Sequence, residues 1–183
     1  MKPRAASTLV LLLAVALAAG CALPPASGEE FTSGAPAVTR AVVTKHTDGD
    51  TAHVRLDGGA EEKVRFIGID TPEVGDAPEP FGEEAAAYTA REIPLGATVW
   101  LETDAELRDR HGRLLAYVWL ERPVRGDDAE VRASMLNAHL LSDGYAQTLT
   151  VPPNVAHADL FRTLQAEARD AGAGLWAEPS AED

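Results

Sequence analysis

Three short segments rich in β-branched residues, separated by Asp-Gly turns, most strongly constrain what this chain can fold into. Val38–Lys45 and Thr51–Leu56 flank Asp48-Gly49, and Lys63–Ile69 follows a second turn at Asp57-Gly58-Gly59. Asp-Gly between alternating segments is a strong hairpin signal, because glycine adopts the positive φ that tight turns need. The pattern predicts a β-meander. Lys63–Ile69 has no purely polar face, as expected for a strand curled into a barrel.

Strand and helix patterns continue through the rest of the chain. Runs at Thr98–Thr103 and Leu114–Leu120 predict two further strands, and Pro123–Asp128 has the composition of a hairpin tip. Alanine-rich or amphipathic segments that end at glycine or proline predict three helices. These are Glu83–Ile93, Met135–Asp143 and Ala158–Ala171. With 45% hydrophobic residues to form a core, this order indicates a small α+β barrel.

The N-terminal residues have the pattern of a secretory signal. Lys2 and Arg4 precede the apolar run Leu9–Ala19, which is shorter than the ~18 residues of an ordinary transmembrane helix. We expect residues 1–20 to be a signal peptide and residues 21–37, rich in Pro, Ser, Gly and Glu, to be a flexible tether. The folded domain would then be residues 38–178, followed by an acidic C-terminal tail, residues 179–183.

The only cysteine, Cys21, directly follows this signal. Leu17–Cys21 resembles the box at which bacterial lipoproteins are cut and lipidated, although Ala18 stands where Leu is usual. A lipidated Cys21 would anchor the protein to the extracytoplasmic side of the membrane, because a diacylglyceryl group supplies the two chains that stable anchoring needs. The alternative is an ordinary secretory signal with a chance cysteine. One cysteine excludes an intramolecular disulfide and a cysteine-rich zinc site.

The chain is strongly acidic, with 29 Asp and Glu against 16 Lys and Arg and a net charge of −13. This balance argues against sequence-independent coating of nucleic acid, which depends on neutralising many phosphates with Lys and Arg. A nucleic-acid partner would have to be held by a local arginine cluster or a metal ion. Salt adaptation and a GC-rich genome both explain the acidity, and the sequence does not separate them.

Carboxylates gather at two predicted turns. Asp50 lies on the first Asp-Gly turn, and Asp70-Thr71-Pro72-Glu73 follows the third strand. Pro72 has a fixed φ and disfavours helix at Thr71, so this turn is stiff. Asp50, Asp70 and the Thr71 carbonyl would make the hard-oxygen site that Ca²⁺ prefers, with water completing its shell. For any single acid, a plain hairpin turn or strand-end cap is the competing interpretation.

Two arginines accompany these acids. Arg65 precedes Asp70 on the same predicted strand, and Arg113 follows a glycine turn at the start of another. Two guanidinium groups facing a metal would grip a phosphate bidentately and stabilise the charge on a pentacoordinate phosphorus. For either arginine alone, a solvated strand face is the simpler interpretation.

Taken together, these motifs resemble one known family. DGDT, RFIGIDTPE, DRHGRLLAY, NAHLLSDGYA and GLW follow one another at distances typical of the staphylococcal nuclease (thermonuclease) family, from Val38 to Trp176. The resemblance implies a five-stranded OB-fold barrel with three helices. It also implies Ca²⁺-dependent hydrolysis of DNA and RNA at the P–O5′ bond, which leaves 3′-phosphate ends. No pattern indicates an oligomer, so we expect a monomer.

The resemblance assigns roles to the matching acids. Asp50 and Asp70 would be the carboxylate ligands of Ca²⁺, with the Thr71 backbone carbonyl as a third ligand. Glu73 would position the attacking water and act as the general base. Asp48 would support these ligands without touching the metal. The cation would act as a Lewis acid and as a template for water and phosphate.

The resemblance also assigns roles to basic residues. Arg65 and Arg113 would bind the scissile phosphate and its transition state. Arg110 and His111 stand where the family has Lys-Tyr before the Gly-Arg pair, and both are possible substrate contacts. A surface turn is the alternative role for His111.

Two stretches depart from the family pattern. Val74–Pro80 contains no basic residue where family members often have a lysine-rich loop, and Thr150 and Pro152 stand where the prototype has two tyrosines. An aromatic stacking platform, worth ~1–3 kcal/mol per base, is therefore missing. These losses favour an alternative function, a non-catalytic OB-fold binding module at the cell surface.

Overall fold

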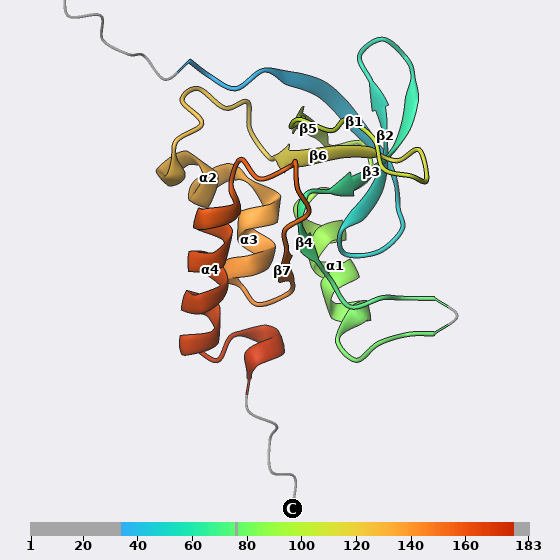
Figure 1. Cartoon of the computed structure of the whole chain (residues 1–183). Coiled ribbons are helices and arrows are strands. Elements are labelled where there is room, and N and C mark those ends of the chain that lie inside the picture. Colours follow the sequence, from blue (N-terminus) through green and yellow to red (C-terminus); the bar gives the residue numbers. More distant parts are fainter. Residues whose placement is uncertain (1–33, 76, 178–183) are drawn as a thin grey trace, which may run out of the picture. The chain divides into compact units, whose positions relative to one another are not determined.

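The structure is a computed structural model that describes residues 34–75 and 77–177, and its framework is a closed five-stranded barrel (Figure 1). The strands pair in the order β1-β2-β3-β6-β5, and β5 closes the barrel on β1. The pairing is antiparallel except between β3 and β6. This architecture confirms the predicted α+β barrel. Its strands are β1 (Val38–His46), β2 (Thr51–Leu56), β3 (Glu61–Phe66), β5 (Thr98–Glu102) and β6 (Leu114–Trp119).

Short turns join β1, β2 and β3 into an antiparallel meander. The Thr47 N–H donates to the Thr51 carbonyl (3.1 Å) across the first turn, and Gly59, at a φ of 84°, closes the second. The register of β1 against β2 shifts between Val43 and Lys45. Such a bulge bends and twists a strand, which lets the two ends of β1 pair with different neighbours, β5 and β2.

The third predicted strand, Lys63–Ile69, is broken in two. β3 ends at Phe66, and β4 (Gly68–Asp70) leaves the barrel to pair with β7 (Gln147–Leu149) in a separate two-stranded sheet. Gly68 has a φ of 80°, and a Cβ there would lie 2.8 Å from the Phe161 ring, so conformation and packing both require glycine. The break carries the end of β4 away from the barrel wall.

Four α-helices and a 3₁₀ turn complete the fold of the described residues, one helix more than the three predicted. The predicted hairpin tip at Pro123–Asp128 is wrong, because residues 123–127 form a loop that leads into the extra helix, α2, at Asp128. Asp127 caps α2 by accepting the Glu130 N–H, and the Glu130 carboxylate accepts three N–H groups of the loop. Asp-x-x-Glu is a helix-start pattern. The helices are α1 (Gly82–Glu92), α2 (Asp128–Ser134), α3 (Leu136–Ser142), α4 (Ala158–Asp170) and η1 (Gly174–Trp176).

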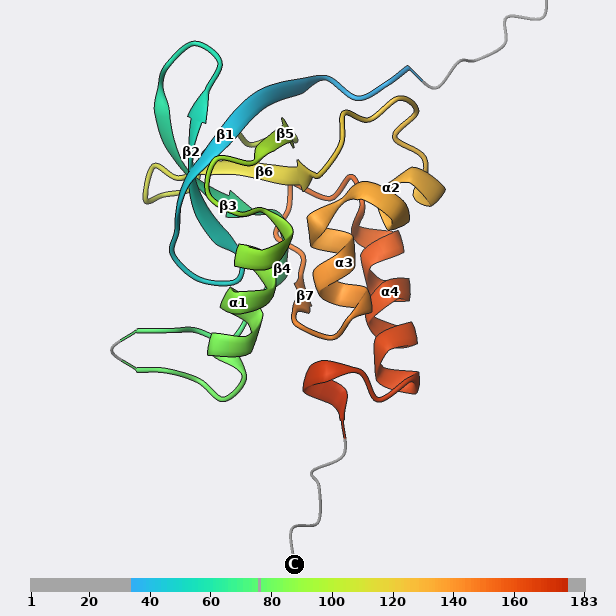
Figure 2. The ribbon, with the colours of Figure 1, turned by 180° about the vertical axis from the view of Figure 1, so that it is seen from behind.

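The helices lie on one side of the barrel. Figures 1 and 2 show β4 and β7 running between α1 and the packed pair α3 and α4. Tyr117 and Trp119 of β6 are fully buried at the centre of the core, and Phe161 and Leu164 supply the buried face of α4. No helix among the described residues is long and apolar enough to span a bilayer. The predicted signal peptide, Cys21 and the acidic tail lie outside the described residues.

Asn137 ties α3 to the break between β3 and β4. Its side chain is fully buried; Oδ1 accepts the Val118 N–H (2.9 Å) and Nδ2 donates to the Ile67 carbonyl (2.9 Å). Because the chain changes direction between β3 and β4, the Val118 N–H and the Ile67 carbonyl have no partner in the β-sheet. The side-chain amide of Asn137 bonds both groups.

Replacing Asn137 with alanine should lower the free energy of unfolding by about 2–5 kcal/mol, because two buried backbone groups lose their partners. Urea unfolding measures the loss. Ser142→Ala in the same helix is the control, since the Ser142 hydroxyl bonds the local His139 carbonyl. Equal losses in the two variants would contradict the role given to Asn137.

Candidate active site

The turn between β1 and β2 presents a buried carboxylate. Asp48 Oδ1 accepts the N–H of Asp50 (3.1 Å), which shapes the turn. Asp50 is only 4% exposed. Its Oδ1 accepts the Thr51 hydroxyl (3.0 Å) and its Oδ2 accepts the Thr71 N–H (2.9 Å). Asp50 therefore joins the first acidic turn to the segment that follows β4.

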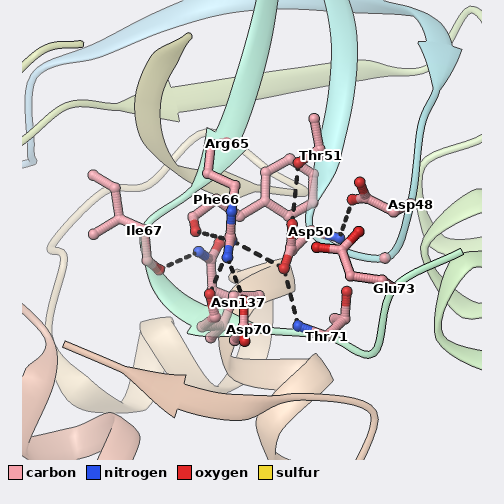
Figure 3. Close-up of polar contacts among 12 residues, drawn as sticks. Asp48, Asp50, Thr51, Arg65, Phe66, Ile67, Asp70, Thr71, Glu73 and Asn137 are labelled. Carbon is pink, nitrogen blue, oxygen red and sulfur yellow. Dashed lines mark hydrogen bonds and ion pairs between the residues drawn. The ribbon is translucent and has the colours of Figure 1, made fainter. Parts of the chain in front are cut away.

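Arg65, near the end of β3, lies between the two predicted metal ligands (Figure 3). Its Nη1 is 3.0 Å from Asp50 Oδ2, and its Nη2 is 2.7 Å from Asp70 Oδ1. Nη1 also donates to the carbonyls of Phe66 (3.0 Å) and Ile69 (2.9 Å). The guanidinium thus bonds the backbone on both sides of the strand break, which holds Asp70 beside Asp50.

The protonation of Asp50 depends on its neighbours. The pKa of Asp50 is raised to about 7, mainly by burial; the Arg65 charge and hydrogen bonds from Thr71 and Thr51 oppose the rise, and the Asp48 charge adds to it. A further cation beside Asp50 would favour the charged form of this carboxylate.

The turn after β4 brings Glu73 back to the same place. Figure 3 shows the Glu73 side chain pointing toward Asp50, on the side away from Arg65. Thr71 is 4% exposed, and its hydroxyl is buried without a hydrogen-bond partner. A Cβ on Gly49 would lie 2.8 Å from that hydroxyl, so glycine allows the two turns to touch.

The donor set suits a hard divalent cation. Asp50 and Asp70 contact the Arg65 guanidinium, and Figure 3 shows Asp48 and Glu73 on the other side of Asp50. A divalent cation would offset the excess negative charge of these four carboxylates. Carboxylate and carbonyl oxygens are the ligands that Ca²⁺ prefers. Within residues 34–75 and 77–177, no three His, Cys, Asp or Glu side chains are placed to hold a metal by themselves. A Ca²⁺ held by Asp50, Asp70 and the Thr71 carbonyl would take its other ligands from water or substrate.

Arg113, before β6, lines the same pocket as Arg65. The pocket has a volume of about 200 Å³, and Leu115, Leu149 and Val151 form an apolar wall. Leu149 and Val151 are 43% and 56% exposed. A phosphate held by the two guanidinium groups would therefore lie next to a surface that can accept a sugar or base without aromatic stacking.

Asp109 holds Arg113 in place. Its Oδ2 accepts from Arg113 Nε (2.6 Å), and its Oδ1 accepts the N–H groups of Arg113 and His111. Burial raises the pKa of Asp109, but these hydrogen bonds outweigh burial and hold it below its ordinary value. Arg110 and His111 are exposed, contact each other (3.0 Å), and do not line the pocket.

Two residues that support the site could not be recognised from the sequence. Asp109 stands in the DRHGRLLAY motif, but only its bond to Arg113 shows that it orients that arginine. Thr89, fully buried in α1, donates its hydroxyl to the Gly49 carbonyl (2.6 Å) and so supports the turn that carries Asp50. No local pattern distinguishes Thr89 from other residues of an alanine-rich helix.

The barrel, the acid cluster and the paired arginines define the class of this protein as an OB-fold barrel with an acid–arginine site. A family model described as staphylococcal nuclease homologue matches residues 63–178. Thermonuclease of Staphylococcus intermedius is 36% identical over 138 residues, which cover 74% of each chain. Thermonuclease of Staphylococcus hyicus is 33% identical over 137 residues and 73% of each chain. Endonuclease YncB of Bacillus subtilis is 31% identical over 136 residues, 72% of this chain and 58% of that protein. The chain belongs to the staphylococcal nuclease family, as the resemblance predicted.

Replacing Arg65 with methionine should destabilise the metal-free protein by about 3–5 kcal/mol near pH 8, because a buried carboxylate loses its cation. The loss should shrink near pH 5. The pKa of Asp50 is already raised to about 7, mainly by burial. Without Arg65 this pKa rises further, so the folded protein takes up a proton that the unfolded chain does not, and it gains stability as the pH falls.

Urea unfolding in EDTA at the two pH values measures this difference. Arg55→Met is the control, because Arg55 is exposed and lies 3.7 Å from an exposed Glu61. The electrostatic account fails if Arg65→Met costs the same free energy at both pH values.

Proposed function

We propose that this protein is a Ca²⁺-dependent nuclease that hydrolyses phosphodiester bonds in DNA and RNA. The observation that carries the proposal is that Arg65 and Arg113 line one pocket while Arg65 also contacts Asp50 and Asp70. A phosphate in that pocket would meet two guanidinium groups at the edge of a carboxylate pair. The thermonuclease and endonuclease relatives support the same activity.

Each residue would have one chemical task. Asp50, Asp70 and the Thr71 carbonyl would hold Ca²⁺, which supplies Lewis acidity and a template when bound. Glu73 would orient a water molecule and accept its proton as the water attacks phosphorus. Arg65 and Arg113 would stabilise the charge that develops on the phosphoryl oxygens. The O5′ atom would leave as its bond to phosphorus breaks and take a proton from water, which gives a 3′-phosphate on one product and a 5′-hydroxyl on the other.

The test is cleavage of denatured DNA and of RNA with Ca²⁺, followed by analysis of the product ends. We expect 3′-phosphate ends and complete loss of cleavage with EGTA. Glu73→Ser and Arg113→Ala should each lower kcat by about 10²- to 10⁴-fold, because each removes a group that acts in the transition state. Arg122→Ala, an exposed arginine packed over Trp100, is the matched control and should be unchanged.

Inactivity of the unmutated protein in both low and high salt would overturn the nuclease proposal. Stabilisation by an oligonucleotide without cleavage would then support the binding module, since a ligand that binds only the folded form raises its stability. The apolar, non-aromatic wall formed by Leu115, Leu149 and Val151 is the feature that fits weak binding.

We also propose that the protein is exported and anchored through Cys21 on the extracytoplasmic side of the membrane. The support is the sequence pattern alone, because residues 1–33 lie outside the described residues. Mass spectrometry of the N-terminal peptide from membranes should show cleavage before Cys21 and a diacylglyceryl group on its sulfur. An unmodified Cys21 in the culture medium would contradict anchoring while leaving export intact.

A further inference from the structure

The loop that follows Glu73 returns and bonds both backbone groups of Glu73. Glu79 Oε2 accepts the Glu73 N–H (3.0 Å), and the Glu79 N–H donates to the Glu73 carbonyl (2.9 Å). Reciprocal bonds between the same two residues fix the position and the orientation of the Glu73 backbone. Both residues are exposed, so these bonds are not part of the hydrophobic core.

The start of α1 packs against the hydrogen-bonded pair Glu73 and Glu79. The Gly82 N–H donates to the Glu79 carbonyl (3.1 Å), and a Cβ on Gly82 would lie 2.4 Å from the Glu73 carbonyl oxygen. Phe81 has a φ of 73°, a rare conformation for a bulky residue, and its ring stacks on Tyr145 at 5.3 Å. Such strain persists only where the surrounding packing enforces it. The first turn of α1 therefore has a defined position against Glu73.

The same helix also contacts the opposite acidic turn. Thr89, on α1, donates its hydroxyl to the Gly49 carbonyl at 2.6 Å, directly before Asp50. Through its two ends α1 thus touches the backbone that carries Glu73 and the backbone that carries Asp50. A hydrogen-bonded helix between these contacts keeps the two acids at a constant separation.

We propose that Glu79 is a positioning residue for Glu73, and that Glu79 together with α1 forms a strut which sets the place of Glu73 relative to Asp50. This inference rests on the proposed function, in which Glu73 accepts the proton of the attacking water. A general base must lie within hydrogen-bond reach of that proton. Because the strut holds the backbone of Glu73, only the side-chain torsions of Glu73 remain free to move.

The test compares Glu79→Ala with Glu79→Gln at saturating Ca²⁺. Alanine removes the acceptor of the Glu73 N–H, whereas glutamine keeps an acceptor oxygen and loses only the charge. Glu79→Ala should lower kcat about 10- to 100-fold at unchanged KM, since a displacement near 1 Å costs up to ~10²-fold. Glu79→Gln should restore kcat to within about twofold of the unmutated protein. The melting temperature should stay the same in both variants, because the lost bond is exposed.

A double-variant cycle separates positioning from a general structural effect. In a Glu73→Ala background, Glu79→Ala should cause no further loss of kcat, because the residue to be positioned is already gone. Glu84→Ala, an exposed acid on α1 with the same charge change, is the matched control. Equal losses in Glu79→Ala and Glu79→Gln would overturn the proposal, as would the same fold-loss with and without Glu73.

Amide hydrogen exchange at Glu73 tests the strut without any activity. Exchange should become faster in Glu79→Ala and stay slow in Glu79→Gln, and equal exchange rates in the two variants would overturn the inference. An inactive unmutated protein would defeat the proposed function, whereas an active Glu79→Ala beside an impaired Glu73→Ser would defeat only the strut.

Discussion

The guanidinium of Arg65 is the interaction on which the site depends. It neutralises Asp50 inside the protein, reaches Asp70 at the surface, and bonds backbone carbonyls on both sides of the break between β3 and β4. The Arg65 side chain thus stabilises the fold where the chain leaves the barrel, and it brings together the two carboxylates proposed to hold Ca²⁺. Lysine could not make these four contacts, because it lacks the planar fork.

Most of the barrel and the membership of the acid cluster could be predicted from sequence, because both depend on local chemistry. The turn at Asp48-Gly49 and the stiff segment around Pro72 each determine the chain direction over a few residues. The side chains of Asp50, Asp70 and Arg65 then meet because short turns leave β2 and β3 few ways to pair. Their proposed roles in catalysis remain predictions that the cleavage assay decides.

Features that depend on distant contacts could not be predicted in the same way. The break at Gly68 is invisible in an alternating strand pattern, because the contact that requires glycine there is with the Phe161 ring, which comes from α4. Glu79 looks like one more acid in an acidic loop, and only the folded chain shows that it bonds Glu73. The sequence shows that aromatic rings are missing at Thr150 and Pro152. It does not show that the neighbouring Leu149 and Val151 line the pocket instead.

The parallel pairing of β3 with β6 has a consequence for the order in which the molecule is made. Val64 lies opposite Leu114, so the wall that carries Arg113 can join the barrel only after the whole intervening chain has emerged. Contacts between such distant residues form slowly, because closing a long loop costs conformational entropy before any stabilising bond forms. A shorter nascent chain presents the acids and Arg65 without their partner arginine. Any reactivity toward phosphodiesters that needs Arg113 is therefore latent until β6 has emerged and paired with β3.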